Sequence, residues 1–180
     1  ARRPGRWRRA ADGAPAPRVE LAAPGFQSPQ GFTPDGARLL VYDQFKDLSV
    51  FAIGPQPRIE PLLHSEAEHR LGRISPDGRW ILYESDESGK QFEIFLRPFP
   101  DVAATREKVS INGGRYPRWS PKGSELYYVS LDGDMLAVPV TLSPSLKVGR
   151  ATKLFSWRKP PPDRGAMPYD VSPIDGRFIV

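Results

Sequence analysis

Two histidines with acidic residues between them are the first side chains in this sequence whose types could do chemistry. They are His64 and His69, and they enclose Glu66 and Glu68. Imidazole and carboxylate ligands together suit zinc. Their spacing matches no standard pair of zinc ligands, and the segment has the composition of an exposed connection. We therefore predict no metal site and no cofactor here.

Basic and aromatic side chains form a second group of candidates. Arginine and tyrosine are common contact residues at binding sites. Several of them stand immediately before the repeated segments described below, and His69 holds the same kind of position. The competing interpretation is that they solvate a face and stack between structural units. The candidate binding residues are His69, Arg73, Arg115, Tyr116 and Arg118.

Three aspartates, Asp35, Asp77 and Asp175, recur at the same position of a repeated segment described below. They could be read as calcium ligands. A shared metal role would not tolerate Lys122, which stands at the corresponding place in the third copy. Because aspartate also hydrogen-bonds its own backbone in tight turns, turn formation explains these residues fully.

The charge is concentrated at one end of the chain. The net charge is +5, from 26 basic and 21 acidic residues, and five arginines fall within the first nine positions. Without those five, 21 basic residues face 21 acidic ones, so the remaining chain is neutral. A nucleic-acid binder is expected to spread basic residues over a folded face. We predict no nucleic-acid partner.

Cysteine is absent, which excludes disulfides, thiolate metal sites and cysteine nucleophiles but does not identify the compartment. No stretch approaches the roughly 18 apolar residues of a membrane span. The basic N-terminal segment has no apolar run behind it, so it is not a secretion signal. Because the sequence begins with alanine, we expect a piece of something longer.

An internal repeat in the sequence indicates which strands and turns hold the candidate binding residues. Four segments align on Pro34, Pro76, Pro121 and Pro173, at intervals of 42, 45 and 52 residues. Blades of four strands in a β-propeller repeat at about 40–45 residues. The repeated segments span 32–42, 74–83, 119–128 and 171–180. We predict an all-β fold of four-stranded propeller blades, with about four blades present.

Each copy has the chemistry of a turn followed by a buried strand. Proline fixes φ, aspartate bonds its own backbone, and glycine supplies positive φ. The apolar and aromatic runs that follow are nearly continuous, which indicates strands buried on both faces. Further strands are expected at 92–99 and 108–111 in the second copy and at 135–140 and 152–155 in the third. No helix is expected, because no apolar period of 3.6 is sustained.

The residues that carry a family resemblance are Ser75-Pro-Asp-Gly-Arg79, Tyr83-Glu-Ser-Asp-Glu-Ser-Gly89, Phe92-Glu-Ile-Phe-Leu-Arg-Pro-Phe-Pro100, Gly113-Gly-Arg-Tyr-Pro-Arg-Trp-Ser-Pro121, Met135-Leu-Ala-Val-Pro-Val140 and Tyr169-Asp-Val-Ser-Pro173. This series resembles TolB-like (WD40-like) propellers, and within them the last blades of propellers fused behind bacterial serine/threonine protein kinases. The resemblance covers residues 26–180 and implies a propeller of six blades.

The chain holds fewer repeats than that number. Residues 5–22 have the pattern of the outer strands of a preceding blade, so we divide the chain into 1–25, with its basic terminus, and 26–180. We expect part of a six-bladed propeller. The alternative is that the two terminal half-blades combine and close a four-bladed ring, the small end of the known range. The proline-rich segment 157–168 is expected to be a loop between blades, or a place where a partner docks.

No catalytic machinery is recognisable in the sequence. The glycine-rich loop and Asp-Phe-Gly of kinases are absent, and so is the Gly-x-Ser-x-Gly elbow of hydrolases. We expect a non-catalytic binding or scaffold module with a protein or peptide partner, or a small ligand. The alternatives are the accessory propeller of a prolyl-oligopeptidase-like hydrolase, or a periplasmic TolB-like protein. An extracytoplasmic location would follow if the propeller belongs to a membrane-anchored kinase or to a TolB-like protein.

Overall fold

The computed structural model describes residues 27–44, 46–89, 91–157 and 167–180, and every regular element in these ranges is a β-strand. All the paired strands are antiparallel. Within the same ranges, no helix has the length and apolar character that crossing a bilayer requires. The segment 5–22 and most of 157–168, for which the sequence predicts outer strands and a loop, lie outside the described residues.

The strands form three complete sheets and one further hairpin, in chain order. The first blade contains β1 (Gln27–Phe32), β2 (Arg38–Asp43), β3 (Asp47–Ala52) and β4 (Arg58–Leu63). The second contains β5 (His69–Ile74), β6 (Trp80–Ser85), β7 (Glu93–Pro98) and β8 (Glu107–Lys108). The third contains β9 (Arg115–Trp119), β10 (Glu125–Val129), β11 (Asp134–Thr141), β12 (Lys147–Val148) and β13 (Thr152–Ser156). The hairpin pairs β14 (Asp170–Val171) with β15 (Phe178–Ile179).

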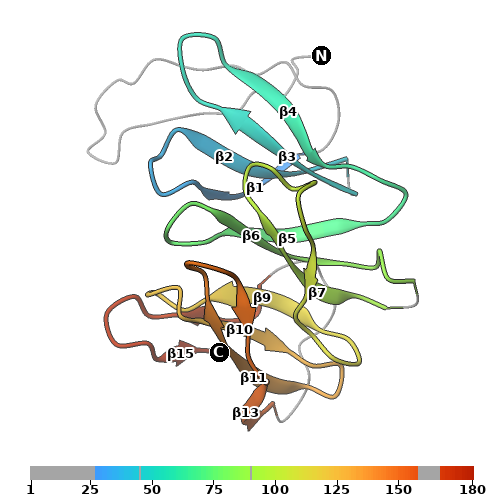
Figure 1. Ribbon diagram of the computed structural model, residues 1–180, viewed down its shortest axis with the longest axis vertical. Coiled ribbons are helices and arrows are strands. Elements are labelled where there is room, and N and C mark those ends of the chain that lie inside the picture. Colours follow the sequence, from blue (N-terminus) through green and yellow to red (C-terminus); the bar gives the residue numbers. More distant parts are fainter. Residues whose placement is uncertain (1–26, 45, 90, 158–166) are drawn as a thin grey trace.

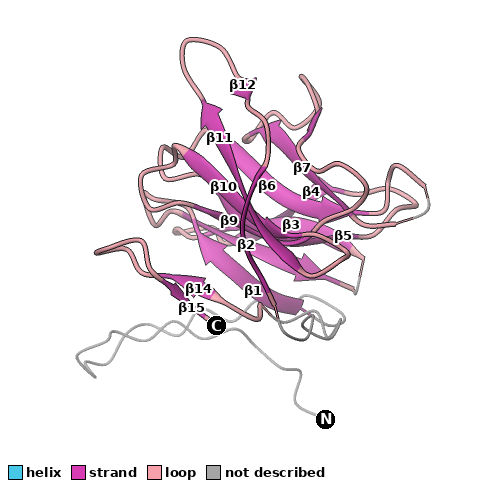
Figure 2. Ribbon diagram, turned by 90° about the horizontal axis from the view of Figure 1, so that it is seen from below, coloured by secondary structure: helices cyan, strands magenta, loops and turns pink. Residues whose placement is uncertain are grey.

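The sheets are stacked face to face along the long axis of the molecule, from the first blade at one end to the third blade at the other, with β15 beside the third blade (Figure 1). Figure 2 looks along this stack and places β1 and β14, the first strands of the first and last sheets, at the same side of it. The first strands of neighbouring blades contact one another, β1 with β5 and β5 with β9. This arrangement of consecutive antiparallel sheets is that of β-propeller blades, as the sequence predicts, although the third sheet has five strands because β13 also pairs with β11.

The apolar core lies between the sheets rather than within any one of them. Each second strand carries the nearly continuous apolar run of its repeat, and β6 is buried from Ile81 to Ser85. Burial on both faces is what a sheet between two others requires. The cluster between blades one and two contains Leu40, Leu48, Val50, Leu63, Ile81, Tyr83, Phe95 and Phe99. The cluster between blades two and three contains Leu82, Ile94, Leu96, Val109, Trp119, Leu126, Tyr128, Val138 and Val140.

A third cluster joins blade three to the β14–β15 hairpin. Tyr127 on β10 meets Phe178 on β15 edge to face, with ring centroids 4.9 Å apart. Met135 and Tyr169 are buried in the same cluster. Because edge-to-face aromatic pairs add to the free energy of simple burial, this contact holds the hairpin on the third blade.

The repeated proline segments form the turns between the first and second strands of the blades. In each turn the backbone N–H of Thr33, Ser75, Ser120 or Ser172 donates to a carbonyl five residues later, at 2.8–2.9 Å. The turn glycines, Gly36, Gly78, Gly123 and Gly176, all have positive φ, between 68° and 75°. This left-handed backbone strongly favours glycine. The aspartates are occupied within their own turns, as Asp77 is by the Ser75 hydroxyl and the Arg79 N–H.

Two of these glycines allow the stability cost of backbone strain to be measured apart from the cost of a contact between blades. A Cβ at Gly123 would lie 3.2 Å from Cδ of Pro76 in the preceding blade, whereas a Cβ at Gly36 would meet nothing within 4 Å. We expect Gly36→Ala to lower the free energy of unfolding by about 1–2 kcal/mol through positive φ alone. Gly123→Ala should cost about 1 kcal/mol more because the two turns must move apart. Urea denaturation measures both variants, and equal losses would show that the Pro76 contact is unimportant.

The fourth strand of the second blade is shorter than the sequence predicts. A strand was expected at 108–111, but β8 ends at Lys108, and one further backbone bond joins Val109 N–H to the Ile94 carbonyl at 2.8 Å. Beyond it the Ser110 hydroxyl accepts the Ile94 N–H at 2.8 Å and donates to the buried Glu93 carboxylate. Side chains thus replace the backbone ladder there. The strand expected at 152–155 is present as β13.

Candidate functional site

The first strands of the blades lie side by side and are interrupted at the same level by β-bulges. The register of β1 shifts between Pro29 and Gly31, and that of β5 shifts between Arg70 and Arg73. The register of β9 shifts between Arg115 and Arg118. Bulges re-aim side chains and are frequent beside functional sites. Here they place a polar surface along the first strands, which we call the inner edge: Gln30, Arg73, Arg118 and Asp170.

Arg73 crosses the inner edge from the second blade to the first. Its Nη1 donates to the Gly72 carbonyl at 2.8 Å and to the Gln30 carbonyl at 3.0 Å. The Gln30 side-chain oxygen lies 3.3 Å from the same nitrogen. Burial and the nearby charge of Arg118 lower the pKa of Arg73 to about 10. The guanidinium is therefore held in one orientation in an electropositive environment.

Arg118 crosses the inner edge in the other direction, from the third blade to the hairpin. Its Nη1 lies 3.2 Å from Oδ1 of Asp170, and its Nε is buried with no hydrogen-bond partner. The Arg118 side chain is 23% exposed, whereas that of Asp170 is 65% exposed. The indole N–H of Trp119 donates to the Arg73 carbonyl at 3.1 Å, which ties β9 to β5. Arg73 and Arg118 are thus neighbours, as their electrostatic interaction also shows.

Arg115 belongs to a different cluster from the other two arginines. Its guanidinium carbon lies 5.3 Å from the centre of the Phe92 ring, and that of Arg70 lies 3.9 Å from the same ring. Cation–π contacts of this kind stabilise packing between blades. The structure therefore brings Arg73 and Arg118 together at the inner edge and places Arg115 on a separate aromatic platform.

Tyr116 and His69 are buried, with 1% and 3% of their surface exposed. The Tyr116 backbone is held on both sides, because its N–H donates to Glu84 at 2.7 Å and its carbonyl accepts the Tyr169 hydroxyl at 2.8 Å. Its φ of 59° is the left-handed conformation of the bulge. Both side chains are buried between the blades, Tyr116 in the cluster that joins blade three to the hairpin.

His69 is held by one side-chain hydrogen bond. Its Nε2 lies 2.8 Å from the Ser65 hydroxyl, while its Nδ1 is buried with no partner. Its ring meets Tyr83 edge to face at 5.8 Å. Burial lowers the pKa of His69 below 6.5, and Arg97 acts in the same direction, against the opposing charges of Glu87, Asp47 and Asp86.

A pH dependence of stability follows from the buried His69. The unfolded chain takes up the imidazole proton first, so the free energy of unfolding should fall as the pH drops below about 6.5. The slope contributed by this group is at most about 1.4 kcal/mol per pH unit. His69→Gln should flatten the curve of urea midpoint against pH, and exposed His64→Gln should leave it sloped. Identical slopes for His69→Gln and the unaltered chain would contradict this assignment.

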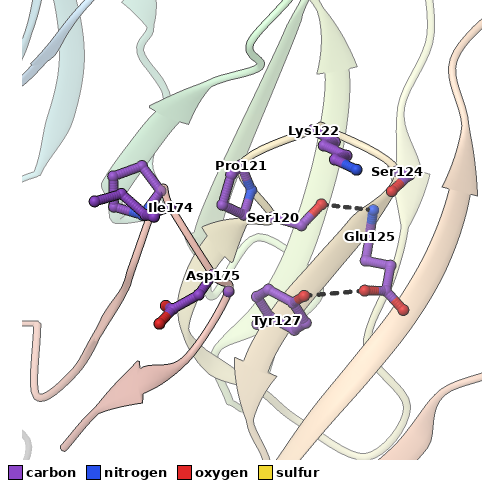
Figure 3. Close-up of a pocket in the computed structure, with 10 residues that line it drawn as sticks. Ser120, Pro121, Lys122, Ser124, Glu125, Tyr127, Ile174 and Asp175 are labelled. Atoms are coloured by element: carbon purple, nitrogen blue, oxygen red, sulfur yellow. Dashed lines mark hydrogen bonds between the residues drawn. The ribbon is translucent and has the colours of Figure 1, made fainter.

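A shallow pocket of about 290 Å³ lies between the turn that opens blade three and the turn of the β14–β15 hairpin (Figure 3). At the two earlier junctions, the turns approach closely, with Pro34 against Gly78 and Pro76 against Gly123. At this junction Gly176 meets nothing within 4 Å. The fourth turn has one extra residue, Ile174, which is 93% exposed. That insertion is the sequence signal for the pocket, which the repeat alignment alone did not single out.

The pocket is lined by both apolar and charged groups. The Tyr127 hydroxyl donates to the Glu125 carboxylate at 2.9 Å. Burial and this hydrogen bond raise the pKa of Tyr127 to about 12. Pro121 and Ile174 form the apolar rim, and Lys122 lies above Ser124 (Figure 3). Its charged groups include both signs, so the pocket does not select an ion by charge.

Metal ligation has no support among the described residues, where no group of three or more His, Asp or Glu side chains could hold an ion. The exposed His64 is paired with Asp47, its Nδ1 lying 2.6 Å from the carboxylate. His64 and His69 bond to different partners and form no shared site.

Comparison with known proteins identifies the fold. No protein-family model matches the chain. The uncharacterized protein Atu1656 of Agrobacterium fabrum is 30% identical over 112 residues, which cover 61% of this chain and 38% of that protein. The chain therefore spans less than half the length of this curated relative.

The solved structures that are similar include β-propellers. A candidate TolB of Agrobacterium tumefaciens has a TM-score of 0.57 at 23% identity, over 76% of this chain and 53% of that one. The β-propeller domain of Cps50 (Swd1) from Myceliophteria thermophila has a TM-score of 0.56 at 12% identity, over 78% and 49%. A puromycin hydrolase complexed with PGG has a TM-score of 0.51 at 17% identity, over 90% and 34%. These similarities show the fold: the chain is a set of β-propeller blades.

Proposed function

We propose that these blades are a non-catalytic binding and scaffold module of a larger bacterial protein, and that a protein or peptide partner docks at the inner edge. The observation that carries the proposal is the placement of Arg73 and Arg118 on adjacent, hydrogen-bonded strands of two blades. Arg73 is oriented by backbone carbonyls of two strands, and Arg118 by one exposed carboxylate. Guanidinium groups with unused donors in a partly buried setting are frequent anchors at interfaces.

A serine/threonine kinase is the proposed context, in which the propeller senses or recruits. This rests on the resemblance of the repeat series, with residues 1–25 ending a preceding blade and 26–180 forming the propeller. The similarity to puromycin hydrolase favours a second candidate, the accessory propeller of a hydrolase. A TolB-like periplasmic protein is a third. Reading the genomic frame on both sides separates them by a kinase signature upstream, a hydrolase elbow downstream, or a signal peptide.

The binding function is tested by selecting peptides from a random phage-displayed library on the 180-residue chain. We expect selected peptides to bind the unaltered chain and to lose about tenfold or more in affinity with Arg73→Gln or Arg118→Gln, which corresponds to about 1.4 kcal/mol. Arg79→Gln is the matched control, because Arg79 is exposed in the second turn and paired only with Asp77 there. Failure to select any peptide, or equal binding by all three variants, would contradict docking at the inner edge.

A further inference from the structure

Among the residues that the structure describes, the inner edge carries one uncompensated positive charge. Arg73 on β5 and Arg118 on β9 come from strands joined by the Trp119 indole N–H, which donates to the Arg73 carbonyl at 3.1 Å, and the charge of Arg118 acts on Arg73. Asp170 is the carboxylate ion-paired with Arg118. Glu84 acts on Arg73 at longer range, but its carboxylate is engaged by Arg70 at 2.5 Å. Two guanidinium charges against one local carboxylate leave a net charge of +1. A single negative charge would neutralise the site.

The two arginines also have hydrogen-bond donors to spare. Each guanidinium carries five N–H groups. All the hydrogen bonds of Arg73 within the described residues use Nη1, and the buried Nε of Arg118 has no partner. A buried donor without an acceptor costs free energy, which an incoming acceptor would recover.

Asp170 shows which chemistry the site accepts. Its carboxylate makes one contact of 3.2 Å with Arg118 and is 65% exposed, and its Oδ1 also accepts the N–H of Val171. A carboxylate that is mostly exposed and makes a single ion-pair contact is weakly held. An external carboxylate that reaches both guanidinium groups can therefore compete with it for the donors of Arg118.

We propose that Arg73 and Arg118 together bind one carboxylate group of a peptide partner, which binds beside the Asp170 carboxylate and competes with it for the donors of Arg118. The inference rests on the proposed function and names the group that the inner edge recognises. A carboxylate has the single charge that balances the site, whereas a phosphate dianion would leave it negative. Arginine forks also match the planar geometry of a carboxylate in bidentate pairing. The carboxylate belongs to an aspartate or glutamate side chain or to a C-terminus.

The test follows the arginine Nε–Hε signals of the ¹⁵N-labelled chain by NMR during titration. The side-chain arm uses acetyl-Gly-Glu-Gly-amide, the C-terminal arm uses acetyl-Gly-Gly-Gly with a free carboxylate, and acetyl-Gly-Gln-Gly-amide is the neutral control. Inorganic phosphate is the fourth probe. We expect saturable shifts of the Arg73 and Arg118 signals with at least one carboxylate peptide, and none with the neutral peptide. The stronger of the first two arms identifies the source of the carboxylate.

Two substitutions with opposite expected effects make the result decisive. Arg118→Gln should weaken carboxylate binding about tenfold or more, because a charge-assisted hydrogen bond to the carboxylate is lost. Asp170→Asn should strengthen it severalfold, because the competing carboxylate is removed while the side chain keeps its shape. Arg79→Gln should change neither value. The gain with Asp170→Asn cannot come from loss of folding.

Three outcomes would overturn the carboxylate site: no saturable shift of either arginine, tighter binding of phosphate than of both carboxylate peptides, or weaker binding after Asp170→Asn. The proposed function fails separately. If library peptides that lack any carboxylate still depend on Arg73 and Arg118 for binding, docking at the inner edge is supported and the carboxylate site is refuted. If no library peptide binds while the acetylated peptides shift both arginines, the carboxylate site stands without a peptide-binding function.

Discussion

Glu84→Ala is expected to lower the free energy of unfolding by about 3–5 kcal/mol, the usual consequence of removing one partner of a buried ion pair. Glu84 is fully buried on β6, and its two oxygens reach different blades. Oε1 accepts Arg70 Nε at 2.5 Å within the second blade, and Oε2 accepts the Tyr116 N–H at 2.7 Å from the third. The substitution would remove the acceptor nearest to a guanidinium that is only 12% exposed.

The same carboxylate holds the bulge that shapes the inner edge. Tyr116 has positive φ at the centre of the β9 bulge, and its N–H points to Glu84. Burial raises the pKa of Glu84, while Arg70 and the Tyr116 N–H oppose that shift. Because the neutral form is comparatively well tolerated, Glu84→Gln should cost less than Glu84→Ala. We also expect Glu84→Ala to weaken peptide binding at Arg118, two residues beyond the bulge.

Urea denaturation measures the loss, with Glu60→Ala as the matched control. Glu60 makes an ion pair of the same chemistry with Arg58 at 2.5 Å, but the two side chains are 52% and 65% exposed. Exposed pairs contribute about 0–1 kcal/mol. A loss for Glu84→Ala no larger than that for Glu60→Ala would show that the buried carboxylate does not join the blades.

Leu82→Ala is expected to lower the free energy of unfolding by about 2–5 kcal/mol, through lost apolar burial and the cavity left behind. Leu82 is fully buried on β6 in the cluster between blades two and three. Leu126 and Val138 reach it from the facing sheet, so a cavity would lie on the contact between the blades. The rigid sheets on both sides limit how far the site can collapse, which favours the upper part of the range.

Trp119 reports on this substitution because it is 9% exposed and packs in the same cluster. Its fluorescence during urea denaturation should show a lower midpoint for Leu82→Ala. Leu154→Ala on β13 is the control, since that side chain is 45% exposed and its truncation should cost less than about 1 kcal/mol. If Leu82→Ala lowers the urea midpoint no more than Leu154→Ala does, the two sheets do not depend on each other for stability.

The repeat could be recognised without the structure because its signals are local. Proline, aspartate and glycine at successive positions impose a tight turn on their own backbone, and Gly36 and Gly78 show the positive φ that this pattern predicts. The continuous apolar run at Trp80–Tyr83 likewise predicts a strand between two layers, and β6 has that burial. The β-propeller fold follows from turn, strand and period together.

The short fourth strand of the second blade shows where local pattern is insufficient. Lys108–Ile111 has the composition of a strand, yet Ser110 turns its hydroxyl toward Glu93 and the Ile94 N–H. The Glu93 carboxylate, buried on β7, also accepts the Gly113 N–H at 3.0 Å. A buried carboxylate must have its hydrogen bonds satisfied, and this requirement ends the ladder.

The sequence by itself determined the blades, their turns and the set of basic and aromatic residues placed before the second and third repeats. Only the tertiary structure decided that β5 and β9 bring Arg73 and Arg118 to the same edge, that Arg115 stacks on Phe92, and that His69 and Tyr116 are buried. The physical reason is the distance along the chain. Glu84 meets Tyr116 across 32 residues, Arg73 meets Gln30 across 43, and Tyr169 meets Tyr116 across 53. Contacts of that range depend on how whole sheets stack, which no local propensity encodes.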